Sequence, residues 1–339
     1  EMRTAAIALL KKMYFLSDCV GYRKSTLRSM LAATRREAGP LNDDTQTMFV
    51  RDALEVATFF QSLIATEAMP LLQVIEHDAY WQFYFHASSS EVQSAGLTIR
   101  DMLAAHSEYQ IYKLLIGFEG IFGKWEDLKR SESAWDYTDN HRHAAAKQFV
   151  SEINAETIDQ WRKRILEFSK TESDDLATFP VYYQFLQDIG REHPAFAFEL
   201  VTEHEDVMRP FFIALMRGLW KSSYLEKIEI VVDTWIKESK HLIAIAKSLF
   251  DSEPSLLPVL SNVLRQSISI DDRRAIVESM GVAASLYVQG ATASKNIFME
   301  GMRALAKKED ASWAHEMWHS REFRSLIKNV GPGERIEML

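Results

Sequence analysis

The sequence is poor in the residues that cross-link a chain or punctuate it with turns. Cys19 is the only cysteine, which excludes a disulfide within the chain and is typical of a reducing compartment, so we expect a cytoplasmic location. Glycine and proline are also scarce, with 13 and 8 residues in a chain of 339. Folds built from strands need many more turn residues, so the composition disfavours a β protein and favours helices.

Long apolar runs are lacking as well. No uninterrupted stretch approaches the ~20 apolar residues of a membrane span, and residues 1–3 do not lead into the apolar core of a signal peptide. We therefore expect no membrane partner. The chain begins inside a helical pattern over residues 5–13, so we expect it to be a fragment of a larger protein.

Positive charge is in the minority. The 39 Lys and Arg residues face 48 Asp and Glu residues, which gives a net charge of −9. Nucleic-acid binding depends on a positive field, so the balance disfavours a nucleic-acid partner for the chain as a whole. Apolar residues make up 47% of the sequence, which is enough to bury a sizeable core.

Apolar residues recur at helical spacing along most of the chain. In the clearest segment, Ser223 and Glu226 have the spacing of a capping box and precede a stripe with a period of about 3.6 residues. The members of the stripe are Tyr224, Leu225, Ile228, Val231, Val232, Trp235 and Ile236. We therefore predict an all-α protein made of amphipathic helices joined by short loops.

The most polar and least periodic stretch is Lys129–Asn140, which makes it the best candidate for a boundary. We expect an irregular helical region over residues 1–130 and a helical-repeat region over residues 131–339. We also expect the two to pack as one continuous array.

A shift of 48 positions superimposes similar residues in the second half of the chain. Proline falls on proline and arginine on arginine, and apolar positions coincide around them. The pairs include Met208 with Leu256, Pro210 with Pro258, Phe212 with Leu260, Leu215 with Val263, Arg217 with Arg265 and Ile228 with Ile276.

This period resembles the HEAT and armadillo repeats, in which each helical unit covers the apolar face of the next. The resemblance spans roughly residues 175–290. It implies an α-solenoid of stacked antiparallel helical hairpins. Such folds serve as scaffolds, or as regulatory or sensor arms of larger proteins, that bind a partner through one exposed surface.

One segment carries a metal-binding pattern. His315, Glu316 and His319 form an HExxH match, which is similar to the zinc motif of the zincin metalloproteases. On a helix, the two histidines would hold Zn²⁺ and Glu316 would activate a bound water. However, both histidines point away from Trp313 and Met317 on a helical wheel, so we expect an exposed pair. The acidic residues left as third ligands are Glu322, Glu334 and Glu337.

Basic residues cluster on a predicted helix over residues 23–36. The cluster is a candidate surface for a phosphate backbone or an acidic partner, although acidic residues surround it. Its members are Arg23, Lys24, Arg28, Arg35 and Arg36. Between this helix and residue 130 lies an aromatic run over residues 80–85, which we assign mainly to the core.

The sequence supports no catalytic centre and no cofactor, because it lacks a nucleophile with a recognisable local signature. Our leading hypothesis is a non-enzymatic helical-repeat scaffold or arm that binds a protein partner or another part of its parent polypeptide. The alternatives are a zinc-dependent hydrolase that uses residues 315–319 and a nucleic-acid-binding protein that uses the basic helix over residues 23–36.

Overall fold

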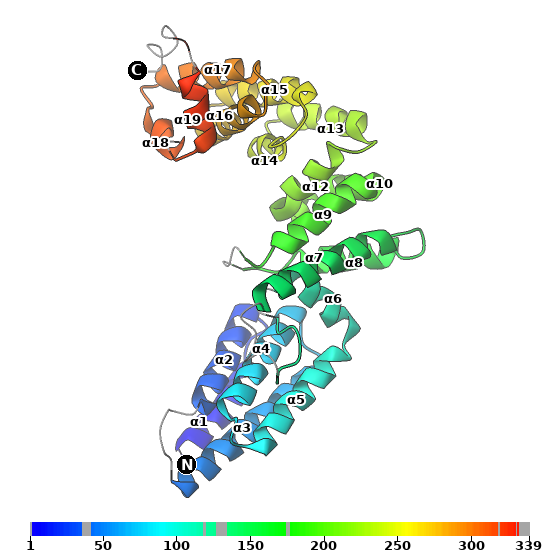
Figure 1. Ribbon diagram of the computed structural model, residues 1–339, viewed down its shortest axis with the longest axis vertical. Helices are drawn as coiled ribbons and strands as arrows, with labels where there is room; N and C mark the ends of the chain where they lie inside the picture. Colours follow the sequence, from blue (N-terminus) through cyan, green and yellow to red (C-terminus); the bar gives the residue numbers. More distant parts are fainter. Residues whose placement is uncertain are drawn as a thin grey trace. The chain divides into compact units, whose positions relative to one another are not determined.

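The computed structural model describes residues 2–35, 42–117, 120–126, 134–173, 177–317, 319–329 and 331, without the side chains of residues 134–139 (Figure 1). Every regular element in these ranges is a helix, and no strand occurs among them. The prediction of an all-α protein is therefore confirmed.

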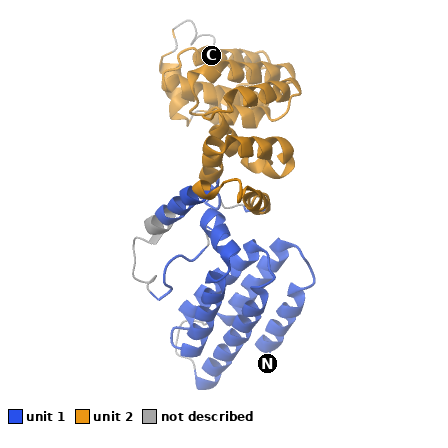
Figure 2. Cartoon of the chain, turned by 90° about the vertical axis from the view of Figure 1, so that its right-hand side faces the viewer, with its two compact units in different colours: residues 1–149, 170–182 blue, residues 150–169, 183–339 orange. Residues whose placement is uncertain are grey.

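The chain divides into two compact units (Figure 2). Unit 1 comprises residues 1–149 and 170–182, and unit 2 comprises residues 150–169 and 183–339. Helix α7 (Ala134–Glu152) begins in unit 1 and ends in unit 2. The predicted division between residues 130 and 131, and the continuous array across it, stay predictions.

Unit 1 is a stack of long helices in which each helix contacts its sequence neighbours and also the next helix but one. Thus α1 contacts α3, α2 contacts α4, α3 contacts α5, and α4 contacts α6. The helices are α1 (Met2–Tyr14), α2 (Val20–Thr34), α3 (Asp43–Leu63), α4 (Met69–Phe85), α5 (Ser90–Ala104) and α6 (Ser107–Ile116).

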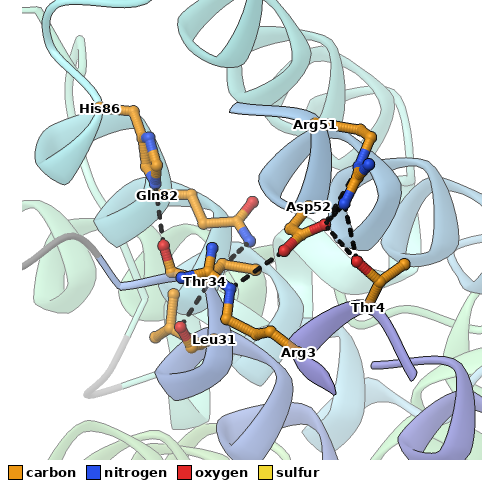
Figure 3. A network of polar contacts seen from close by, with 8 residues as sticks. All are labelled: Arg3, Thr4, Leu31, Thr34, Arg51, Asp52, Gln82 and His86. Carbon is orange, nitrogen blue, oxygen red and sulfur yellow. Dashed lines mark hydrogen bonds and ion pairs between the residues drawn. The ribbon is translucent and has the colours of Figure 1, made fainter. Parts of the chain in front are cut away.

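Buried polar groups tie these helices together. The carboxylate of Asp52 in α3 is fully buried and accepts from Arg3 Nε at 3.0 Å and from Thr4 Oγ1 at 3.3 Å, both in α1 (Figure 3). In the same region, Gln82 and His86 donate to the side chain and the carbonyl of Thr34 at the end of α2. Each buried polar group thus finds a partner on another helix, which specifies how the helices are stacked.

A second buried group in unit 1 is a charge pair. Glu76 in α4 is 2.6 Å from Lys113 Nζ in α6 and accepts from Tyr109 Oη at 2.9 Å and from the Ile121 amide at 3.0 Å. Burial raises the pKa of the Tyr109 phenol, and the adjacent Glu76 carboxylate raises it further. This cluster fixes the segment around Ile121 to the stack.

Unit 2 consists of shorter helices in two rows. In the first row, α10, α12, α14, α16 and α19 contact one another in that order, and in the second row α13, α15 and α17 do so. The helices are α8 (Ile158–Phe168), α9 (Pro180–Glu192), α10 (Pro194–Glu203), α11 (Glu205–Met208), η2 (Arg209–Phe211), α12 (Phe212–Leu219), α13 (Leu225–Lys237), α14 (Leu242–Ser248), η3 (Pro254–Leu256), α15 (Leu257–Ser269), α16 (Arg273–Val288), α17 (Ser294–Ala306), α18 (Ser312–Met317) and α19 (Arg321–Lys328).

The apolar stripes of these helices form the core between the rows. In α13, the buried residues Ile228, Val232, Trp235 and Ile236 belong to the predicted stripe. The predicted capping box is wrong, because α13 begins at Leu225 and no side chain caps it. Instead, the Ser222 hydroxyl accepts from the Tyr224 amide in the preceding turn at 3.1 Å.

The rows also give a different spacing from the predicted 48 residues. Successive first-row helices α12, α14 and α16 begin at residues 212, 242 and 273, which are 30 and 31 residues apart. A shift of 48 places Leu215 of α12 on Val263 of α15, and these helices belong to different rows. The similarity between them reflects two amphipathic helices that pack into one core and not one hairpin repeated in space.

Candidate binding groove in unit 2

A groove of about 480 Å³ runs across the first row of unit 2. Its wall comes from α12, α14, α16, α18 and α19, and from residues that follow α14 and α18. Since the apolar stripe of each helix faces the core, the side chains beside the stripe are left to line the groove. They are Ile213, Arg217, Lys247, Phe250, Val277, Glu278, Gly281, Val282, Glu316, Met317, Ser320 and Glu322.

The middle of the groove is apolar and open. Val277 and Gly281 lie one helical turn apart on α16, and a Cβ built at Gly281 meets no atom within 4 Å. Glycine inside a helix is less stable than alanine, so helix stability does not favour a glycine at this position. Its effect in this fold is to leave space in the groove.

Two ion pairs cross the wall of the groove. Lys247 Nζ on α14 lies 2.9 Å from Glu278 on α16, and Arg273 Nη2 on α16 lies 2.6 Å from Glu316 on α18. Both pairs are partly exposed, so they contribute little stability. Their main effect is to hold neighbouring helices of the row in register.

Glu322 leaves a carboxylate at the α19 end of the groove. It accepts from the Ser320 hydroxyl at 2.8 Å, and no cation among the described residues pairs with it. Its pKa is lowered by a hydrogen bond from its own backbone amide and by the one from Ser320. Glu322 is therefore a negative charge near neutral pH.

Arg217 provides the opposite charge at the α12 end. It has no carboxylate partner in the described part of the chain, and its one hydrogen bond runs from Nη2 to the Lys247 carbonyl at 3.4 Å. Nε is buried without an acceptor, and the guanidinium carbon lies 5.9 Å from the centre of the Phe250 ring. A partly buried guanidinium without a carboxylate is a group that an anionic ligand would complete.

A smaller hollow of about 150 Å³ adjoins the groove. The two cavities share Arg217 and Phe250. The other residues of the hollow are Gln187, Trp220, Lys221, Ser248, Asp251 and Ser252. Polar groups dominate this lining, in contrast to the apolar centre of the groove.

The HExxH segment does not form one continuous helix. His315 lies in α18, which ends at Met317, and His319 follows this end. Both histidines are exposed and Trp313 and Met317 are buried, as the helical wheel predicts. Glu316 lies in the groove wall and pairs with Arg273, and so its carboxylate is not free to activate a water.

No group of three or more His, Cys, Asp or Glu residues placed to hold a metal occurs within the described ranges. Of the predicted third ligands, Glu322 lies in α19, where its carboxylate bonds to Ser320. Glu334 and Glu337 lie outside the described residues. The zinc-hydrolase alternative thus rests on two exposed histidines and a paired glutamate.

The basic cluster over residues 23–36 is largely engaged within unit 1. Arg23 in α2 bonds to Glu67 at 3.1 Å and to Asp18 at 2.6 Å, and Arg35, just after α2, lies 4.7 Å over the Phe85 ring. Lys24 and Arg28 also have interaction partners, and Arg36 lies outside the described residues. These contacts compete with any phosphate ligand.

The aromatic run on α4 is only partly core. Phe83 is buried against Trp125, while Tyr84 is 38% exposed. Trp81 stacks on Phe85 at 5.4 Å along the same helix face. The run thus contributes one residue to the core and a ladder of rings at its edge.

Comparison of the chain with protein-family models, with curated proteins and with solved structures finds no match. Within the described residues, no helix has the length and apolar character required to cross a membrane. The case for a function therefore rests on the groove.

Sequence reasoning missed the groove residues. Arg217 stood out only as one member of a repeat pair, and Lys247 and Glu278 belong to separate helices. Gly281 is the one local signal, because a glycine inside an otherwise regular helix suggests that something approaches it closely or that space is needed there.

Proposed function

We propose that this chain is a helical-repeat scaffold whose unit 2 groove binds an extended segment of a protein partner. The observation that carries the proposal is a groove across successive helices of one row, with an apolar centre and unpaired charges of opposite sign at its ends. No part of this function has been tested so far.

The helix contacts support the repeat interpretation. In each unit, helices contact both their sequence neighbours and the next helix but one, which is the pattern of stacked hairpins. The spacing of 30 and 31 residues in unit 2 is shorter than the roughly 40–47 residues of HEAT and armadillo units. We therefore propose a solenoid of short hairpins and leave the family open.

The charges of the groove define the partner segment. Arg217 favours an acidic side chain at the α12 end, and Glu322 favours a basic side chain at the α19 end. Val277 and Gly281 between them favour an apolar side chain. An extended peptide carries such groups along its length, whereas a compact small molecule would leave one end of the groove unpaired.

A helical-repeat arm of a larger protein would use the same groove. The partner segment would then come from elsewhere in the parent polypeptide. We commit to a separate protein as the source, because charge complementarity alone defines the segment.

Selection of random peptides displayed on phage tests the proposal. Peptides enriched on the wild-type chain should carry an acidic, an apolar and a basic residue in that order. Gly281→Leu should abolish their binding, because the new side chain fills the open centre of the groove without meeting a neighbour.

Two control variants isolate the groove. Gly281→Ala should bind nearly as well as the wild type, and Ile230→Arg should bind unchanged because Ile230 is 70% exposed on α13 of the other row. Selection that yields only peptides indifferent to Gly281→Leu would refute the groove as the binding surface.

A further inference from the structure

We propose that the hollow beside the groove is a carboxylate-binding pocket that receives the acidic side chain of the partner segment. The inference rests on the proposed function for the source of the carboxylate, but the pocket is testable with a small probe alone. The hollow lies in unit 2, with Gln187 of α9 on one side and the turn after α14 on another.

The first argument is unsatisfied polarity. The Ser252 side chain is more than nine-tenths buried, and its Oγ has no hydrogen-bond partner. Arg217 lines the same hollow, with a single long hydrogen bond from Nη2 and a buried Nε that has no acceptor. Buried polar groups in folded proteins are nearly always paired, so two incomplete donors that share one cavity indicate a missing acceptor.

The second argument is charge. Arg217 and Lys221 place two cations at the hollow, and neither has an ion-pair partner among the described residues. Asp251 is the one carboxylate in the lining, and it accepts from Gln289 Nε2 at 2.5 Å. The excess of positive charge favours an anion.

The third argument is size and shape. A volume of about 150 Å³ admits one side-chain tip and excludes a folded element. Trp220 and Phe250 supply flat apolar walls, and the Trp220 Nε1–H group is already used by Ser248 Oγ at 2.8 Å. A planar guanidinium matches a planar carboxylate through two parallel hydrogen bonds, so a glutamate or aspartate side chain fits these donors.

The position of Asp251 explains how the turn forms one wall. Its backbone has a φ of 62°, in the left-handed region that non-glycine residues seldom adopt. The turn at Asp251 connects Phe250, which lines both cavities, to Ser252, which lines the hollow. A partner that fills the groove over Phe250 therefore reaches the hollow with its next side chain.

The experiment titrates the full chain with N-acetylglutamate amide and observes the Trp220 indole N–H by NMR, with the resonance assigned from Trp220→Phe. N-acetylglutamine amide is the matched control, because it has the same shape without the charge. The carboxylate probe should shift the resonance saturably, and the amide probe should not.

Loss of Arg217 should raise the Kd of the carboxylate probe at least about tenfold, because a charge-assisted hydrogen bond contributes roughly 1.5–3 kcal/mol. Lys221→Gln should also weaken binding, by a smaller factor, and it keeps the result interpretable if Arg217→Gln fails to fold, because Lys221 is exposed. Inorganic phosphate is added as a competing probe.

The outcomes separate the two proposals. No saturable shift, an equal shift with the amide probe, or tighter binding of phosphate than of the carboxylate would overturn the carboxylate pocket. Peptides that need Gly281 would still support the groove in that case. Conversely, probe binding that Arg217→Gln abolishes would support the pocket even if no peptide bound the groove.

Discussion

Gly190 in α9 and Gly218 in α12 lie at a close helix crossing within unit 2. A Cβ on Gly190 would come within 2.5 Å of the Leu215 carbonyl oxygen, and a Cβ on Gly218 would come within 2.6 Å of Gly190 Cα. Neither contact is tolerable without a shift of the backbone, so the two glycines set the distance between these helices.

The first prediction concerns this crossing. Gly218→Ala should destabilise unit 2 by about 1–3 kcal/mol, because overpacking forces the helices apart. Urea denaturation with tryptophan fluorescence measures the effect. Gly281→Ala is the matched control, and it should stabilise by about 0.5–1 kcal/mol because its Cβ enters open space. Equal effects of the two substitutions would contradict the packing argument.

The second prediction concerns the buried charge pair of unit 1. Lys113→Met should destabilise by about 3–5 kcal/mol, because it leaves the Glu76 carboxylate buried without a cation. Adding Glu76→Gln should recover part of the loss, since a neutral amide still accepts from Ile121. The exposed pair of Lys11 and Glu55 serves as a control, and Lys11→Met should cost no more than about 1 kcal/mol.

The third prediction concerns acid. Hydrogen bonds from the Ser312 hydroxyl, from Arg273 and from the Ser312 amide lower the pKa of Asp310 from 3.8 to about 2. Because the folded pKa lies below the unfolded value, the carboxylate stabilises the start of α18 above pH 4. This stabilisation is lost as the pH falls from 4 toward 2.

A carboxyl ¹³C titration by NMR measures the Asp310 midpoint directly. Ser312→Ala removes the strongest of the three hydrogen bonds and should move the pKa of Asp310 up toward its ordinary value. A midpoint near 4 in the wild-type chain would show that the contacts around Asp310 are not formed in solution.

The fourth prediction concerns the HExxH segment. The purified chain should not retain stoichiometric zinc after dialysis, because His315 and His319 are exposed and lie on either side of the end of α18. Elemental analysis decides the matter. One zinc per chain that is lost in the double variant His315→Ala and His319→Ala would restore the hydrolase alternative.

The fifth prediction concerns the basic cluster. Arg23→Gln should destabilise unit 1 by roughly 1–3 kcal/mol, because it leaves the nearly buried Glu67 carboxylate without its guanidinium. The wild-type chain should flow through heparin at low salt. Retention that falls steeply with salt and disappears in Arg23→Gln would instead support nucleic-acid binding.

The helical class was predictable because its signals are local. An apolar stripe such as that of α13 depends on residues three and four positions apart, and the scarcity of glycine and proline leaves few places where a helix must stop. The exposed histidines beside buried Trp313 and Met317 followed from the same periodicity. The cap at Ser223 failed because tertiary packing and the turn at Ser222 decided where α13 begins.

Long-range features were beyond the sequence. The 48-residue similarity pairs α12 with α15, yet the structure places helices that begin 30 and 31 residues apart in one row. Two amphipathic helices look alike whichever row they join, because the core requires the same apolar stripe of both. Which helices stack is decided by contacts such as that of Gly190 with Gly218.

The sequence by itself thus determined that this chain forms amphipathic helices with a large apolar core. Only the tertiary structure decided that Arg217, Lys247 and Glu278, from three helices, would line one groove beside Gly281. The physical reason is range. Helix formation is governed by neighbours within one or two turns, whereas a binding surface is made by side chains whose helices meet only after the core has packed.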